Sequence, residues 1–204
     1  MTALQRIVMV RHGETVGESS VRYYGATDIA LSDLGRAQVR AAARGLPGDA
    51  FDLVVSSPLF RAWESATLVA PGRPVRLDAD LREIDFGRWE GLSAAEIEAQ
   101  DPVRYRDWQQ RSPGFDYPDG ERRVDFQARV ARAVDAMLAA RVASVLAVAH
   151  KGVIRTMVRK LTGEEPTEGL PPLAGVLQLS RDVRGSWFLG RRSSCPEPAP
   201  ATAR

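Results

Sequence analysis

The chain has few of the residues that build covalent cross-links or thiolate metal sites. Its 204 residues include a single cysteine, Cys195, so no disulfide can form within the chain, and a zinc site built on several thiolates is excluded. No apolar run approaches the roughly 20 residues that a membrane-spanning helix requires, and the N-terminus shows no signal-peptide pattern. We therefore expect a soluble protein of the reducing cytoplasm that does not bind membranes.

Lysine is almost as scarce, because Lys151 and Lys160 are the only lysines among the 28 basic residues. The chain also has 26 acidic residues, so its net charge is small. The arginines lie scattered among carboxylates along the whole chain and form no continuous basic run. Binding to nucleic acids depends mainly on clustered positive charges that contact the phosphates, and the sequence shows no such cluster. We expect no nucleic-acid partner.

Short apolar runs alternate with segments of helical spacing. Residues 6–10, 52–58 and 144–149 are rich in aliphatic side chains, as buried parallel strands are. A helical pattern follows each run, and a longer amphipathic pattern covers 122–141. The alternation predicts a single α/β domain over residues 1–191, a three-layer sandwich in which helices cover both faces of a mostly parallel sheet.

Several details of these elements are also predicted. Ser32 is expected to be the N-cap of a helix whose apolar face holds Leu34, Ala37 and Ala41. The long helix is expected to bury one face, formed by Phe126, Val130, Val134, Met137 and Leu138. The later runs VLQLS and SWFLG are typical of edge or hairpin strands. Residues 192–204, rich in proline and alanine, are predicted to form a disordered tail.

Histidine occurs twice, and His12 and His150 each directly follow an apolar run. Because the carboxyl ends of parallel strands line one crevice, both side chains are expected to face the same place. A lone histidine is more often a hydrogen-bonded residue near the core, and that reading stays open for each. Arg11 and Arg155 accompany the two histidines, however, and arginine offers donors that match phosphate oxygens. The pattern therefore favours a phosphate site.

A series of short motifs runs along the chain. The first is VRHGET, which begins at Val10. The others are GATDIALSDLGRAQ from Gly25, SSPLFRAWESA around Arg61, LREIDFGRWEG around Glu83, PDGE at 118–121 and VAHKGVIR around His150. In this order they resemble the histidine phosphatase superfamily, which includes the cofactor-dependent phosphoglycerate mutases and many small phosphatases.

The resemblance implies roles for four residues at the reaction centre. His12 would attack phosphorus and become phosphohistidine, as a neutral imidazole can. Arg11, Arg61 and His150 would surround the transferring phosphoryl group. Such transfer needs positioning and cationic stabilisation above all, which these side chains supply, so neither a metal nor another cofactor is expected.

Glu83 matches the proton donor of the family. A carboxylic acid that protonates the leaving oxygen accelerates such reactions, and once ionised it can activate the water that cleaves phosphohistidine. The alternative for Glu83 is a surface carboxylate paired with Arg82 or Arg88. Asp85 is the nearest rival for the catalytic role.

The resemblance also implies a set of residues on the substrate side, namely Thr15, Glu18, Arg22, Tyr24, Gly25, Lys151 and Gly152. Two of them depart from common family choices. Glu18 stands where many relatives have asparagine, and a carboxylate at the pocket mouth would repel a second anionic group. Lys151 stands where glycine is common, and it could contact a distal phosphate or carboxylate or face solvent. The segment from Arg22 to Asp28 resembles phosphatases of the α-ribazole-phosphate type.

The segment EIDFGRWEG around the expected proton donor differs from that of the mutases, and the later segment SPGFDYPDGE is shorter than their insertion. Both differences favour hydrolysis of a small phosphorylated metabolite. Phosphoglycerate mutase-type transfer and a non-catalytic module that binds phosphorylated ligands are the alternatives. Selectivity is assigned to residues 92–119, where Arg104, Arg106 and Arg111 could meet an anionic substrate or solvent. The sequence leaves the oligomeric state open, including a homodimer.

Overall fold

The computed structural model describes residues 3–46, 51–110, 112–166 and 170–193. These ranges form a mixed, mostly parallel six-stranded sheet in the order β3-β2-β4-β1-β5-β6. The strands are β1 Arg6–Arg11, β2 Leu53–Ser56, β3 Val75–Leu77, β4 Ser144–Ala149, β5 Val176–Arg181 and β6 Trp187–Ser193. The α-helices are α1 Asp33–Arg44, α2 Phe60–Val69, α3 Ala94–Gln100, α4 Pro102–Gln109, α5 Arg123–Leu138 and α6 Lys151–Thr162, and short 3-10 helices span Ala79–Leu81 and Gly87–Trp89.

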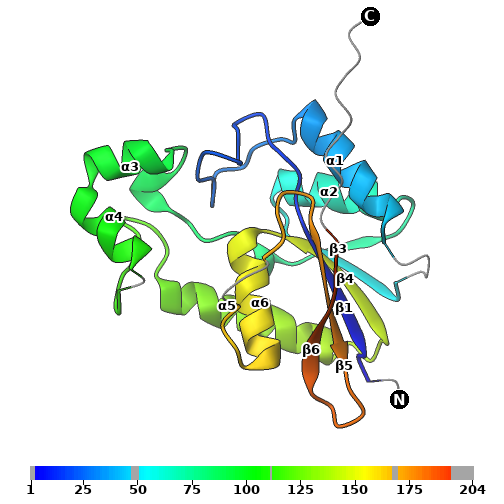
Figure 1. Cartoon of the computed structure of the whole chain (residues 1–204). Coiled ribbons are helices and arrows are strands. Elements are labelled where there is room, and N and C mark those ends of the chain that lie inside the picture. The colour runs from blue at the N-terminus through cyan, green and yellow to red at the C-terminus, as the bar shows by residue number, and fades with distance from the viewer. Residues whose placement is uncertain (1–2, 47–50, 111, 167–169, 194–204) are drawn as a thin grey trace, which may run out of the picture.

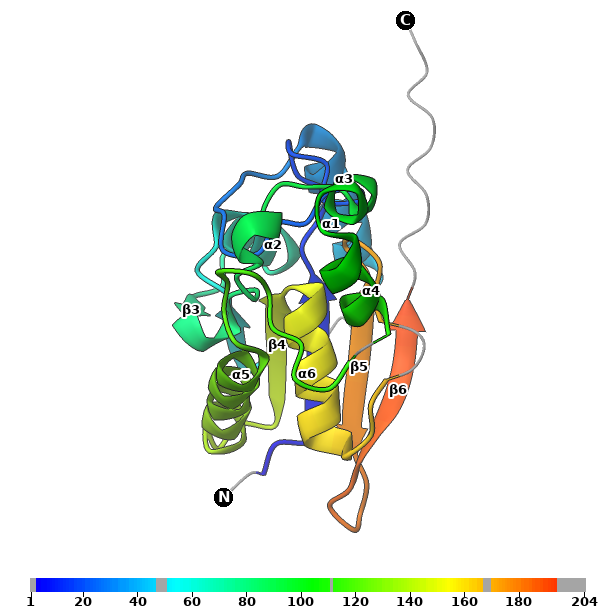
Figure 2. The ribbon, with the colours of Figure 1, turned by 90° about the vertical axis from the view of Figure 1, so that its left-hand side faces the viewer.

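Helices cover both faces of the sheet (Figures 1 and 2). Side chains of β1 point alternately to the two faces, so Ile7 packs into the layer of α5 and α6, whereas Val8 packs into the layer of α1 and α2. The predicted three-layer α/β sandwich is therefore confirmed. No helix in the described parts of the chain is long and apolar enough to cross a membrane.

Helix α1 confirms one expectation and corrects another. Ser32 Oγ accepts a hydrogen bond from Gly35 N at 3.1 Å, as an N-cap does. The predicted apolar face is wrong, because Leu34 is 48% exposed and the helix buries the side of Gly35 and Val39. A Cβ on Gly35 would lie 1.9 Å from Glu14 O, so the helix meets the loop after β1 through its own backbone.

The long helix α5 buries the predicted face, except that Leu138 in its last turn is 37% exposed. β5 and β6 form the predicted hairpin, with β6 at the edge of the sheet. β6 runs to Ser193, so residues 192 and 193, which were expected in the tail, belong to a strand. The rest of the expected tail, 194–204, lies outside the described residues.

The segment 92–119 folds into α3 and α4, which project away from the sheet at the upper left of Figure 1. Asp101 ends α3 and caps α4, because its side chain accepts a hydrogen bond from Arg104 N. A small aromatic core holds the two helices, and it includes Trp89, Tyr105 and Phe115. This segment, which we call the cap, is the part of the fold that the sequence did not predict.

Candidate active site

The two histidines meet at the carboxyl ends of neighbouring strands. β1 and β4 run parallel, with Arg11 opposite Ala149, and a histidine follows each strand at once. His12 N donates to Ala149 O at 3.1 Å, and the centroids of the two imidazole rings lie 5.2 Å apart. The structure thus brings His12 and His150 to one place, as the strand-end argument predicts.

The His12 ring is buried and held in a defined tautomer. Its Nδ1 lies 2.7 Å from Gly13 O. Because a carbonyl oxygen only accepts hydrogen bonds, Nδ1 must carry the ring proton, and Nε2 of the neutral ring keeps its lone pair. Burial, followed by the charges of Arg61 and Arg11, lowers the pKa of His12 well below its ordinary value. At physiological pH the ring is therefore neutral, as a nucleophile must be.

His150 is fully buried and contacts a serine that the sequence did not single out. Its Nε2 lies 2.9 Å from Ser57 Oγ, which also accepts a hydrogen bond from Leu59 N at 3.3 Å. This favours Ser57 as the donor to Nε2, which places the proton of the neutral ring on Nδ1. Burial, followed by Arg61, lowers the pKa of His150 well below its ordinary value. Nδ1 can then donate a hydrogen bond without carrying charge.

Arg61 is fully buried and binds the loop at residues 24–27. Its guanidinium donates to Thr27 O at 2.8 Å, to Tyr24 O at 3.1 Å and to Gly25 O at 2.8 Å. The same loop is held from the other side by Glu90, whose carboxylate accepts hydrogen bonds from Gly25 N and two following backbone amides. Sequence reasoning missed Glu90, since nothing in its spacing marks it as the anchor of a distant loop.

Three buried side-chain nitrogens have no hydrogen-bond partner within the described ranges. They are Arg11 Nε, Arg61 Nε and His150 Nδ1. A buried donor without a partner costs about 1–3 kcal/mol, so native proteins seldom keep one without a reason. All three belong to the residues expected around a phosphoryl group, and anionic oxygens are the partners that such donors fit best.

Glu83 lies at the same site, buried and bound to two backbone amides. Its Oε2 accepts from Gly152 N at 3.0 Å and its Oε1 from Ile84 N at 3.1 Å. Burial raises the pKa of Glu83, although these two hydrogen bonds and the charges of Arg61 and Arg11 oppose the rise. A Cβ on Gly152 would lie 2.6 Å from Glu83 Oε1, so only glycine lets the first turn of α6 approach the carboxyl group without displacing it.

The alternatives for Glu83 do not agree with the structure. A surface pairing is wrong, because Glu83 is only 7% exposed, and Arg88 forms an ion pair with Asp119 instead. Its rival Asp85 accepts a hydrogen bond from Gly87 N at 2.8 Å and stabilises the start of a 3-10 turn. Asp85 is not among the residues that line the cavity.

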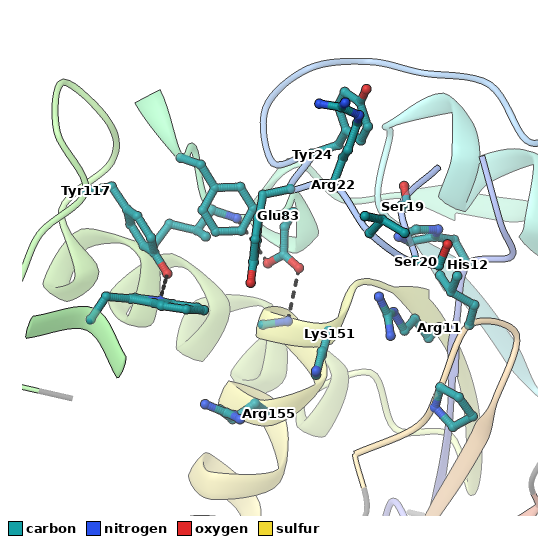
Figure 3. A pocket seen from close by; sticks show the side chains of 18 of the residues that line it. Arg11, His12, Ser19, Ser20, Arg22, Tyr24, Glu83, Tyr117, Lys151 and Arg155 are labelled. Carbon is teal, nitrogen blue, oxygen red and sulfur yellow. Dashed lines mark hydrogen bonds between the residues drawn. The ribbon is translucent and has the colours of Figure 1, made fainter. Parts of the chain in front are cut away.

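A cavity of about 660 Å³ opens beside these residues (Figure 3). Its wall includes Arg11, His12 and Glu83, and also four of the expected substrate-side residues, namely Arg22, Tyr24, Lys151 and Gly152. Arg22 additionally pairs with Glu96 of α3 at 2.8 Å, which ties its loop to the cap. His150 and Arg61 lie behind this wall rather than on it.

Three expected substrate-side residues do not line the cavity. Thr15 is buried, and its Oγ1 lies 2.7 Å from Ser19 Oγ. Glu18 is exposed in a tight turn with φ 61° and is not part of the cavity wall. Gly25 allows close backbone approach, since a Cβ there would lie 1.8 Å from Ile84 O.

The wall on the side of the cap is aromatic, which the sequence did not reveal. It is formed by Tyr23, by Phe86 and by Trp108 and Tyr117 of the cap. Trp108 Nε1 donates to Tyr117 Oη at 3.0 Å, and burial raises the pKa of Tyr117 to about 12, so its hydroxyl keeps its proton. Arg104 and Arg106 are exposed on α4 and do not line the cavity, whereas Arg111 lies outside the described residues.

No group of three or more histidine, cysteine, aspartate or glutamate side chains in the described ranges has the arrangement of a metal site. The cationic and neutral donors around His12 are instead suited to oxyanions.

The sequence is similar to those of known phosphatases. Residues 7–182 match the model of the histidine phosphatase superfamily, branch 1. The chain is 35% identical over 183 residues to glucosyl-3-phosphoglycerate phosphatase of Mycolicibacterium vanbaalenii, which covers 85% of this chain and 80% of the relative. It is 32% identical over 165 residues to adenosylcobalamin/alpha-ribazole phosphatase of Escherichia coli, covering 78% of this chain and 79% of that protein.

A solved structure of mycobacterial glucosyl-3-phosphoglycerate phosphatase is similar in fold. It superposes with a TM-score of 0.79 at 33% sequence identity, over 93% of this chain and 99% of that one. The predicted enzyme of phosphatase type is therefore confirmed over the non-catalytic alternative. The chain belongs to the histidine phosphatase superfamily, as one of its phosphohydrolases.

Proposed function

We propose that the protein hydrolyses a small phosphorylated metabolite in the cytoplasm by transferring the phosphoryl group first to His12 and then to water. The observation that carries this proposal is a set of three buried side-chain nitrogens without a partner in the described ranges, on Arg11, Arg61 and His150. The two arginines act electrostatically on His12, and the centroids of the His12 and His150 rings lie 5.2 Å apart. The relatives are named for small phosphorylated substrates, which supports a substrate of that size.

In the first step, His12 Nε2 forms a bond to phosphorus while the bond from phosphorus to the ester oxygen breaks. Glu83 gives its proton to the leaving oxygen, so the alcohol departs neutral and Glu83 becomes a carboxylate. Negative charge on the equatorial oxygens is met by the donors of Arg11, Arg61 and His150.

In the second step, the Glu83 carboxylate takes a proton from water, and the water oxygen attacks phosphorus. The phosphorus–nitrogen bond breaks, inorganic phosphate leaves, and His12 returns to its neutral form. A mutase would need to exclude water at this stage, whereas here a cavity of about 660 Å³ leads to the site. Its size supports hydrolysis over transfer to a second alcohol.

Turnover of phenyl phosphate in chelator-treated buffer tests the proposal. The wild-type protein should release phosphate without added metal, and His12→Ala should lose about 10⁴-fold or more of kcat. Unchanged thermal unfolding of the variant would show that the fold is intact. Equal turnover by the variant and the wild-type protein would refute the proposal.

A further inference from the structure

Two basic side chains lie one turn apart at the start of α6. Lys151 and Arg155 are separated by four residues, so they project from the same side of the helix, and both line the cavity (Figure 3). The reaction scheme above uses neither of them.

Positive charge dominates this side of the cavity. Arg11, Lys151 and Arg155 all contribute to its wall, whereas Glu83 is the one acidic side chain that the described lining includes. The charge of Glu83 acts on both Arg11 and Lys151. Arg155 reaches Glu165 at 3.7 Å, but Arg159 shares that carboxylate at 3.8 Å. Partial burial in the cavity wall, followed by the charges of Arg11 and Arg155, lowers the pKa of Lys151. Like charges held together in this way favour binding of an anion.

The two side chains lie on the side where the alcohol leaves. Lys151 directly precedes Gly152, whose amide binds the carboxyl group of Glu83, the proposed proton donor. In Figure 3, Lys151 and Arg155 lie on the far side of Arg11 from His12. Lys151 is therefore placed beyond the phosphoryl centre, toward the alcohol part of a bound ester.

Resting on the proposed phosphatase function, we propose that Lys151 and Arg155 bind a second anionic group, a carboxylate or a phosphate, carried by the alcohol part of the substrate. The aromatic side chains Tyr23, Trp108 and Tyr117 line the same cavity, and its volume of about 660 Å³ can hold a ring that joins the two anionic ends. The enzyme would then select phosphomonoesters that carry two separated negative charges.

The test compares para-carboxymethylphenyl phosphate with its neutral primary amide, two esters whose phenols have nearly the same acidity. The wild-type protein should prefer the acid in kcat/KM by on the order of tenfold. Lys151→Met should bring the ratio close to one, and Lys151→Arg should retain most of it. A phosphonomethyl analogue then shows which anion the pair prefers.

The matched control is Lys160→Met, which removes the other lysine of α6, where it pairs with Asp135 at 3.3 Å. This variant should keep the wild-type ratio. Equal rates for acid and amide in the wild-type protein would overturn the proposal. A ratio that Lys151→Met leaves unchanged would also overturn it, since Lys151 would then not contact the second anion. So would a ratio that Lys160→Met lowers equally, since the preference would then reflect the overall positive charge rather than a defined site.

Binding separates this proposal from the proposed function. Calorimetry on the His12→Ala protein should show tighter binding of the acid than of the amide, and the added Lys151→Met substitution should abolish the difference. If His12→Ala keeps full turnover, the phosphohistidine scheme fails, while this binding difference still decides whether the second anion site exists.

Discussion

The phosphoryl centre and the alcohol side of the cavity differ in how their side chains are held. At the centre, His12, His150 and Arg61 are buried and fixed by bonds to backbone or to a buried serine. On the alcohol side, half-buried aromatic rings meet edge to face, and Lys151 is exposed. A rigid centre suits one reaction on many esters, whereas the looser wall suits adjustment to one alcohol. Substitutions should therefore affect rate at the centre and substrate preference or stability at the wall.

The largest effect expected after loss of His12 comes from Glu83→Gln, which keeps the shape of the side chain but removes the proton. For an alkyl phosphate, kcat should fall by about 10²–10⁴-fold, because the leaving oxygen is poor. For para-nitrophenyl phosphate the loss should be much smaller, since that oxygen needs no proton. Steady-state rates on both esters check this, and equal losses would count against Glu83 as the acid.

The next largest effect is expected from Gly152→Ala, because the added Cβ would lie 2.6 Å from Glu83 Oε1 and force the carboxyl group to move. A displacement of this kind should lower kcat by roughly 10–100-fold with little change in thermal unfolding. The control is Gly190→Ala on β6, where a Cβ would meet its nearest atom at an ordinary 3.4 Å. Full activity in Gly152→Ala would show that the contact with α6 does not position Glu83.

The pH dependence of kcat/KM tests the protonation states assigned to His12 and Glu83 at the phosphoryl centre. Neutral His12 is present only above its pKa, which burial and two arginines lower. Protonated Glu83 is present only below its pKa, which burial raises. For an alkyl phosphate, activity should therefore persist into acid below the ordinary titration of histidine and fall as pH rises through the pKa of Glu83. Glu83→Gln should remove the alkaline fall, and a profile identical to that of the wild-type protein would contradict the assignment.

The smallest effect is expected at the aromatic wall. Tyr117→Phe removes the acceptor for Trp108 Nε1 and should lower the free energy of unfolding by about 1 kcal/mol. Because Tyr117 touches none of the groups at the centre, kcat should change less than KM. Urea unfolding and steady-state kinetics measure the two effects. A large fall in kcat with unchanged KM would mean that the wall takes part in the chemistry.

The sequence predicted the phosphoryl centre better than the wall, for a physical reason. His12 and His150 follow apolar strands, and strand ends converge in any parallel sheet, so local pattern was sufficient. Glu18 was expected on the substrate side, but it lies in an exposed turn with positive φ outside the cavity wall, and no periodic pattern predicts such a turn. The aromatic wall was not predictable, because Tyr23 and Trp108 come together only through the packing of the cap, which no periodic pattern encodes. The buried face of α1 was missed because a glycine, Gly35, makes the closest contact.

The most direct test of the account is the identity of the phosphorylated nitrogen. Rapid mixing with labelled phenyl phosphate, quenching in alkaline detergent and phosphorus NMR with mass spectrometry would locate the label. Because Nδ1 of His12 donates to Gly13 O, the account predicts phosphate on Nε2 of His12 and on no other atom. Label on Nδ1, on His150 or on no residue of a protein that turns over would contradict it.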